Sequence, residues 1–174
     1  MRFAYADPPY LGQARRHYQA DPRCAEVDHG VLLAELTQGA FDGWALSCSS
    51  PSLRILLPLC PPEVRVMSWV KPFAIFKPHV NPAYTWEPVL VWGGRPRTRH
   101  QPTVRDWVAA NITLQRGLAG VKPFAFCSWL FAVLNMQAGD EFVDLFPGSG
   151  AVQRAWQRYA QQPCQLSLVL EAED

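Results

Sequence analysis

Apolar residues along the chain alternate between short runs typical of buried strands and longer patterns typical of helices. Strands are predicted where proline, glycine or polar residues bound an apolar run, over 2–6, 44–49, 64–71, 88–92, 141–146 and 165–171. Helices are predicted from Asp28 to about Gly39, from Ser50 onward, from Pro123 to about Gln137 and from Gly150 to about Gln161. Residues 104–115 fit either a helix or an irregular arm. This alternation predicts an α/β fold, a mostly parallel sheet with helices on both faces.

The composition fits one globular domain and narrows the classes of function. Of 174 residues, 49% are hydrophobic and 18% are charged, which excludes a disordered chain. The net charge is +1, so only a local basic surface could attract a nucleic acid. No apolar run reaches about 18 residues, so no membrane span is expected. The N-terminus lacks an apolar signal core, which favours a cytoplasmic protein. The 5 cysteines include no Cys-x-x-Cys pair, so we expect reduced structural thiols and no metal site.

A glycine-rich turn separates the strand predicted at 141–146 from the helix that begins near Gly150. Its sequence is Asp144-Leu145-Phe146-Pro147-Gly148-Ser149-Gly150. Glycines let a backbone pass close to a ligand, and the helix start offers free N–H groups. The turn lacks both the third glycine of a dinucleotide fingerprint and a Gly-Lys-Ser/Thr sequence. Glu171 lies 23 residues after Gly148, a spacing that suits a carboxylate bound to ribose hydroxyls. Alternatively, Glu171 belongs to an acidic tail with Glu173 and Asp174.

A second motif, Asp7-Pro8-Pro9-Tyr10, directly follows the first predicted strand. In open parallel sheets, ligands bind outside the carboxyl ends of the strands. Two prolines fix the backbone and remove two N–H donors, so the Asp7 carboxylate and nearby carbonyls can accept hydrogen bonds from an exocyclic amine. The Tyr10 ring offers a surface on which a base can stack. Taken alone, the motif also fits a purely structural turn.

Together the two motifs resemble the catalytic and cofactor motifs of S-adenosylmethionine-dependent adenine-N6 DNA methyltransferases. The catalytic motif comes first and the cofactor motif last, which resembles the circularly permuted beta class found in phages and restriction-modification systems. The likeness covers most of residues 1–171. It includes three further stretches: Trp69-Val70-Lys71, the strand sequence from Trp86 to Gly93, and Lys122-Pro123.

The resemblance implies a Rossmann-like methyltransferase fold in a single domain of residues 1–174, acting as a site-specific, adenine-specific DNA methyltransferase. It implies that Asp7, Pro8, Pro9 and Tyr10 hold a base that is flipped from duplex DNA or presented in single-stranded DNA. The methyl group then passes directly to N6 without a covalent enzyme intermediate. The cofactor implied is S-adenosylmethionine, and the residues implied to bind it are Asp7, Lys122, Pro123, Asp144, Phe146, Gly148, Ser149, Gly150 and Glu171.

Two polar segments are rich in arginine and are predicted to contact nucleic acid. Residues 11–27 contain Arg15 and Arg16, and residues 93–121 form a small basic recognition segment inserted within the domain. In the second segment, Arg95, Arg97 and Arg99 alternate and would share one face of an extended chain. With Arg105 they are predicted to contact phosphates, although a solvated loop is the alternative. Four tryptophans are expected to lie in the core: Trp44, Trp107, Trp129 and Trp156.

The chain departs from the family near its end, which keeps two other functions open. Few residues follow Glu171, so the next strand of the sheet is expected to be missing, and the recognition segment is short. An uncovered sheet edge invites pairing, so we expect a homodimer. One alternative function is an RNA adenine-N6 methyltransferase, although that group usually carries Asp-Pro-Pro-Trp. The other is a non-catalytic, methyltransferase-like subunit that binds nucleic acid.

Overall fold

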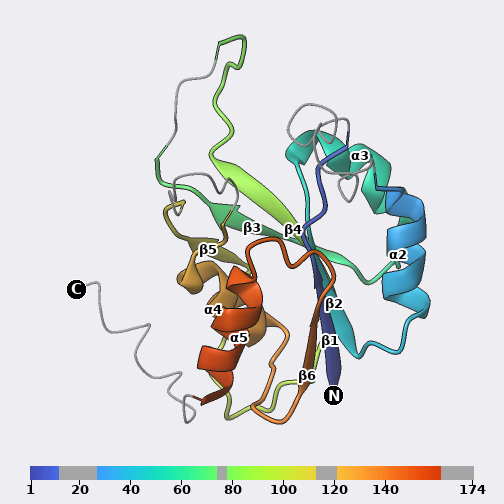
Figure 1. The fold of residues 1–174 in the computed structure, drawn as a ribbon, viewed down its shortest axis with the longest axis vertical. Helices are drawn as coiled ribbons and strands as arrows, with labels where there is room; N and C mark the ends of the chain where they lie inside the picture. Colours follow the sequence, from blue (N-terminus) through green and yellow to red (C-terminus); the bar gives the residue numbers. More distant parts are fainter. Residues whose placement is uncertain (12–26, 74–77, 113–120, 162–174) are drawn as a thin grey trace.

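The computed structural model describes residues 1–11, 27–73, 78–112 and 121–161 (Figure 1). Its sheet has the strand order β5-β3-β4-β2-β1-β6. The strands are β1 (Arg2–Ala6), β2 (Gly43–Ser47), β3 (Arg65–Val70), β4 (Trp86–Gly93), β5 (Trp107–Ala109) and β6 (Glu141–Asp144). Only β4 runs antiparallel to its neighbours β2 and β3, and the other pairs are parallel. The prediction of a mostly parallel sheet is therefore confirmed for the described strands.

Helices lie on both faces of this sheet, as the sequence predicts. They are α2 (His29–Gln38), α3 (Leu53–Leu56), α4 (Phe124–Val133) and α5 (Ala151–Gln161). Alternate residues of β1 enter two separate cores: Phe3 and Tyr5 pack with α4 and α5, while Ala4 and Ala6 pack with α2 and α3. Figure 1 shows the two helix layers on opposite sides of the strands. Within the described ranges, no helix is both long and apolar enough to cross a membrane.

Local chemistry explains where several elements begin and end. The Asp28 carboxylate accepts hydrogen bonds from the amides of Gly30 and Val31, at 2.9 and 3.1 Å, and so caps α2. At the end of β4, Gly93 has a φ of 67°, and a side chain there would lie 2.5 Å from the Asp42 carbonyl oxygen. Only glycine fits this close approach, which turns the chain away from the sheet.

The structure differs from the sequence-based prediction at residues 104–115. A short strand, β5, forms within this segment in place of the predicted helix or irregular arm, and it pairs in parallel with β3. The indole Nε1 of Trp69 donates to the Ala110 carbonyl oxygen at 2.8 Å and fixes the chain beyond this strand. Pairing with an existing edge strand outweighs the weak helical pattern of the segment. Trp107 itself is 43% exposed, so the prediction that it lies in the core is wrong.

The remaining differences concern the lengths of predicted elements. The helix predicted from Ser50 consists of a 3-10 turn, Ser50–Ser52, followed by the single turn of α3. The helix predicted to reach Gln137 ends at Val133, and the strand predicted to reach Phe146 ends at Asp144. The strand predicted over 165–171 lies outside the described residues.

Candidate active site

The two sequence motifs meet at one edge of the sheet. Strands β1 and β6 are parallel neighbours, and Tyr5 lies opposite Asp144. Asp7 therefore follows β1 at the same edge where the turn containing Gly148 and Gly150 follows β6. This edge is formed by the carboxyl ends of the parallel strands, where open α/β sheets bind ligands.

A buried network of charges surrounds Asp7. The Lys122 ammonium lies 3.0 Å from Asp7 Oδ1 and 2.7 Å from Glu87 Oε1. The other oxygen of Glu87 accepts from the Lys71 ammonium at 2.9 Å. The side chains of Lys122 and Glu87 are each 5% exposed, whereas that of Asp7 is 24% exposed. Asp7 is thus the carboxylate of this network that a ligand can reach.

The network sets the charge of its members. Burial opposes ionisation of Glu87, but the ammonium groups of Lys122 and Lys71 outweigh it and lower the pKa of Glu87 to about 2. Burial also opposes a charged Lys122, yet Asp7 and Glu87 raise the pKa of its ammonium. For Asp7, burial and the nearby Glu87 charge outweigh Lys122 and raise its pKa. The site therefore places Lys122, which stays positively charged, beside Asp7, which takes up a proton more readily than an ordinary aspartate.

Aromatic rings form the walls around these charges. The Lys71 and Lys122 ammonium groups lie 4.5 and 5.2 Å from the centre of the Trp69 ring, a distance suited to cation–π attraction. The Tyr5 hydroxyl bonds to Ser47 Oγ at 2.9 Å beneath the site. Burial and the charges of Glu87 and Asp7 raise the pKa of the half-buried Tyr10 phenol well above its ordinary value, so it stays neutral.

The glycine turn presents a second carboxylate at the same edge. Asp144 Oδ1 accepts from the Phe146 amide at 3.2 Å, while Oδ2 is buried and has no hydrogen-bond partner among the described residues. Burial, with a smaller contribution from Asp7, raises the pKa of Asp144 to about 6. Gly148 and Gly150 have φ angles of 46° and 71°, which favour glycine. Near Gly148, a Cβ would meet no atom closer than 3.9 Å, so the space above this backbone is open.

Two members of the site carry no role in the sequence-based prediction. Glu87 and Lys71 occur in stretches that resemble the family, but no chemistry was assigned to either side chain. The sequence does indicate a role for Glu87, because it is a single carboxylate within an apolar strand. Such a group is rarely buried without a cation beside it. Its partners could not be identified from sequence, because Lys71 is 16 positions away and Lys122 is 35.

The described arginines of the predicted set, Arg95, Arg97, Arg99 and Arg105, lie away from this edge, near the amino end of β3 and the carboxyl end of α4. Arg95 forms an ion pair with Asp140, and the Arg97 guanidinium donates to the carbonyl oxygens of Ala132 and Pro102. Both therefore bind groups of this chain near the carboxyl end of α4. Arg99 and Arg105 are exposed. Arg15, Arg16 and Glu171 lie outside the described residues.

The described part of the basic segment is integrated into the domain. Besides the β5–β3 pairing, the Trp129 indole on α4 donates to the Arg105 carbonyl oxygen at 2.9 Å. The Asn135 side-chain amide donates to the carbonyl oxygens of Arg95 and Pro96. These contacts attach residues 95–110 to the sheet edge and to α4.

The fold is similar to that of solved structures. The crystal structure of an M1.HpyAVI–SAM complex matches with a TM-score of 0.62 and 14% identity, over 91% of this chain and 78% of that chain. The crystal structure of M1.HpyAVI alone matches with a TM-score of 0.52 and 14% identity, over 91% and 76% of the two chains. No protein-family model and no curated protein matches the sequence. At this identity, the likeness shows a common fold.

Proposed function

We propose that this protein transfers a methyl group from S-adenosylmethionine to the N6 amine of adenine in DNA. The observation that carries the proposal is the position of Asp7, bound through one oxygen to the buried Lys122 and adjacent to the glycine turn of the next parallel strand. The fold likeness supports it, because the M1.HpyAVI structure of similar fold was solved as a complex with SAM. The order of the motifs favours the permuted beta class.

The residues at the glycine turn fit S-adenosylmethionine. The cofactor carries an ammonium group, and the buried Asp144 Oδ2 atom lacks a partner among the described residues. Gly148 leaves room for a ligand to approach the backbone before α5, whereas the Arg154 guanidinium lies 3.1 Å from the Cβ position of Gly150 and donates to the Ser149 carbonyl oxygen. Phe146, Ser149, Lys122 and Pro123 lie in the segments that border this space, and Glu171 is assigned to the ribose by its sequence spacing alone. When bound, the cofactor supplies a methyl group made electrophilic by its sulfonium.

The chain's own residues orient the amine that receives this methyl group. An adenine amine is a weak nucleophile because its lone pair is delocalised into the ring. Asp7 Oδ2 and the Pro8 carbonyl can accept its hydrogens, which favours a tetrahedral nitrogen with its lone pair directed at the methyl group. Lys122 fixes Asp7 through Oδ1, and the raised pKa of Asp7 suits a carboxylate that receives the released proton. Pro9 keeps the turn rigid, and Tyr10 provides the stacking surface. Positioning supplies most of the rate enhancement.

DNA is preferred to RNA because Tyr10 stands where RNA adenine methyltransferases usually carry tryptophan. In duplex DNA the N6 amine of adenine is base-paired and lies in the major groove. The target base must therefore be flipped out of the duplex or be presented in a single strand. DNA and RNA are compared directly by supplying tritiated S-adenosylmethionine with three substrates of the same sequence: single-stranded DNA, duplex DNA and RNA. We expect label in DNA, released as N6-methyladenine on digestion. Label confined to RNA, or none in any substrate, contradicts the proposal.

The decisive variant is Asp7→Ala. We expect methyl transfer to fall at least about a hundredfold, which is the usual contribution of a positioned acceptor. Cofactor binding measured by titration calorimetry should fall much less than transfer, because the Asp144 carboxylate and the glycine turn remain in place. Glu35→Ala is the matched control, since it removes an exposed carboxylate on α2 and should leave transfer unchanged. Wild-type turnover by Asp7→Ala would exclude Asp7 from catalysis.

A further inference from the structure

One end of the sheet presents exposed aromatic residues on the face that carries α2. Side chains alternate along β3, so Val66, Ser68 and Val70 point to that face. The register places Trp86 opposite Val70 and Trp107 opposite Ser68, hence on the same face. Val66 is 43% exposed, Trp86 40% and Trp107 43%. Figure 1 shows α2 over the other end of the sheet, and among the described residues no helix covers β3 and β5 on this face.

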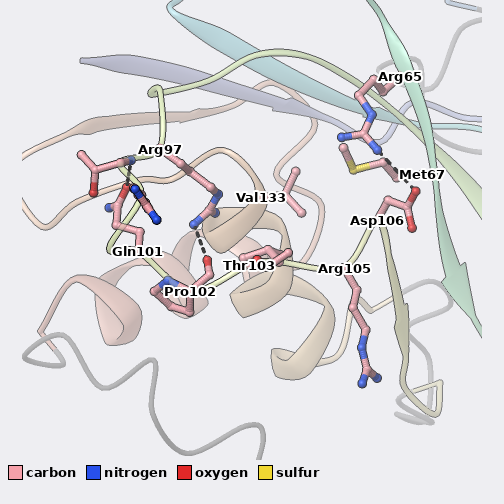
Figure 2. Close-up of a pocket in the computed structure, with 12 residues that line it drawn as sticks. Arg65, Met67, Arg97, Gln101, Pro102, Thr103, Arg105, Asp106 and Val133 are labelled. Atoms are coloured by element: carbon pink, nitrogen blue, oxygen red, sulfur yellow. Dashed lines mark hydrogen bonds and ion pairs between the residues drawn. The ribbon is translucent and has the colours of Figure 1, made fainter.

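A hollow rich in arginine lies at the same sheet edge. Its volume is about 350 Å³, and its walls come from the start of β3, residues 97–106 and the end of α4 (Figure 2). Its charged lining residues are Arg65, Arg97, Arg99, Arg105 and Asp106. Asp106 pairs with Arg65 at 3.3 Å, and Arg97 is bound to backbone carbonyls. Arg99 and Arg105 are exposed. The lining as a whole carries a net positive charge.

The basic hollow and the aromatic face adjoin each other. The Arg105 guanidinium lies 5.3 Å from the centre of the Trp107 ring. Trp86 in turn precedes Glu87, whose carboxylate binds Lys122 on the opposite face of the sheet. The hollow opens on the α4 side of the sheet, because Met67 and Val133 line it, whereas Trp107 and Trp86 lie on the α2 side. Arg105 connects the two sides at the edge strand β5. The exposed path therefore runs from Arg99 and Arg105 around this edge strand, past Trp107 and Trp86, to the end of the sheet that holds Asp7.

We propose that this path binds single-stranded nucleic acid next to the target nucleotide. Cationic side chains beside exposed aromatic rings are the combination that holds such strands, because phosphates pair with arginine and unpaired bases stack on the rings. Stacking on Trp86 and Trp107 requires bases that are free of a duplex, so the path favours a single strand or a locally opened one. This inference rests on the proposed function in one respect, since it takes the bound nucleic-acid strand to be the substrate that is methylated.

The alternative occupant of an apolar sheet face is a second copy of the chain. The concentration of arginine at its border argues against this, because the same positive surface on both copies would repel across a symmetric contact. A polyanion is complementary to that border.

The test is the affinity of a fluorescein-labelled single-stranded DNA 20-mer, measured by anisotropy at several salt concentrations. Stacking is worth about 1–3 kcal/mol per base, so Trp86→Ala and Trp107→Ala should each weaken binding at least about fivefold. Trp86→Phe and Trp107→Phe keep a ring and should recover most of this loss. Val31→Ala, at an exposed apolar position on α2, should bind like the wild type. Arg99→Ala should lower the log–log salt slope by about 0.7 if it contacts one phosphate.

Two results would overturn the inference. The first is an unchanged affinity in the Trp86→Ala/Trp107→Ala double variant, with circular dichroism confirming that it is folded. The second is a wild-type dimer in light scattering that the double variant converts to monomer without a change in DNA affinity, because a second copy then covers this face. The binding assay needs no methyl transfer. Tryptophan-dependent binding without transfer would thus uphold the inference and refute the proposed function, whereas transfer without tryptophan-dependent binding would do the reverse.

Discussion

At the residue scale, Lys122 determines whether two carboxylates can be charged side by side. Its ammonium contacts both Asp7 and Glu87, and its side chain is 5% exposed. Removing one partner of a buried ion pair is far more costly than removing an exposed one, because it leaves charge buried without compensation. Lys71 also pairs with Glu87, but its side chain is 24% exposed, so water can replace it.

This difference predicts unequal effects of two matched substitutions. Lys122→Met should reduce the free energy of unfolding by about 3–5 kcal/mol. Lys71→Met should reduce it by about 1 kcal/mol or less. Urea denaturation followed by circular dichroism measures both. Equal losses would contradict the assignment of Lys122 as the central cation.

The second residue-scale prediction concerns Asp144 and the pH dependence of cofactor binding. Its pKa is raised to about 6, so the carboxylate is charged above that pH and protonated below it. Only the charged form attracts an ammonium group, so the affinity for S-adenosylmethionine should fall as pH drops from 7 to 5. Titration calorimetry should show a loss approaching about tenfold per pH unit below pH 6. Asp144→Asn should bind weakly with little dependence on pH over this range, and the same steep fall in this variant would assign the titration to another group.

At the element scale, two arginines of the predicted recognition segment act as anchors for α4. The carboxyl end of a helix presents unpaired carbonyl groups and a partial negative charge, which favour cations. Arg97 binds the Ala132 carbonyl there, and Arg95 binds both the Asn135 carbonyl oxygen and Asp140. The evenly spaced arginines therefore differ in role. Arg95 and Arg97 stabilise the end of α4, whereas the side chain of Arg99 is exposed.

Stability measurements on single variants distinguish these roles. Arg95→Met should cost about 2–3 kcal/mol, because it removes a hydrogen-bonded cation from the Asp140 carboxylate, which is 3% exposed. Arg97→Met should cost about 1–2 kcal/mol through the lost contact with the helix end. Arg99→Met serves as the exposed control and should stay within about 0.5 kcal/mol. A loss for Arg99→Met as large as that for Arg95→Met would contradict this division.

Most elements could be predicted because their signals are local. Asp28 marks the start of α2, and Gly93 marks the end of β4. The strand β5 could not be predicted, because it exists through pairing with β3 about 40 residues earlier, and the residues of that segment do not encode the partner. The same reason applies to Glu87: its charge is evident in the sequence, but its partners depend on the register of the sheet.

At the scale of the whole molecule, the topology accounts for the position of the candidate site. Placing β1 between β2 and β6 brings the two ends of the described chain together, so that Asp7 and Gly148 lie at one edge despite their separation in sequence. The resemblance to the methyltransferase family implies this proximity, because it assigns Asp7 both to catalysis and to cofactor binding. The motifs did not predict that the arginines would lie at the far end of β3, since Arg65 and Lys71 are roughly 20 Å apart along an extended strand. Among the described residues, substrate contacts at the catalytic edge therefore need side chains other than Arg95, Arg97, Arg99 and Arg105.

The pH dependence of stability combines the charged groups of the whole site. In the folded protein the pKa of Asp144 is about 6, above its ordinary value of about 3.9, so stability should rise as pH falls from about 6 to 4. The pKa of Glu87 is lowered to about 2 from an ordinary value of about 4.3, so about 3 kcal/mol should be lost as pH falls from 4.3 to 2. The raised pKa of Asp7 adds to the rise, and the lowered pKa of Asp140 adds to the fall.

We therefore expect the melting temperature, measured by calorimetry, to pass through a maximum near pH 4–5. One kcal/mol corresponds to about 2–4 °C for a chain of this size, so both limbs should be measurable. Asp144→Asn should flatten the limb above the maximum, because it removes the group that gains a proton on folding. Glu87→Gln should flatten the limb below it, because the folded state then no longer holds a carboxylate that must be protonated on unfolding. A melting temperature that decreases steadily from pH 7 to pH 4 would show that Asp144 does not titrate near pH 6.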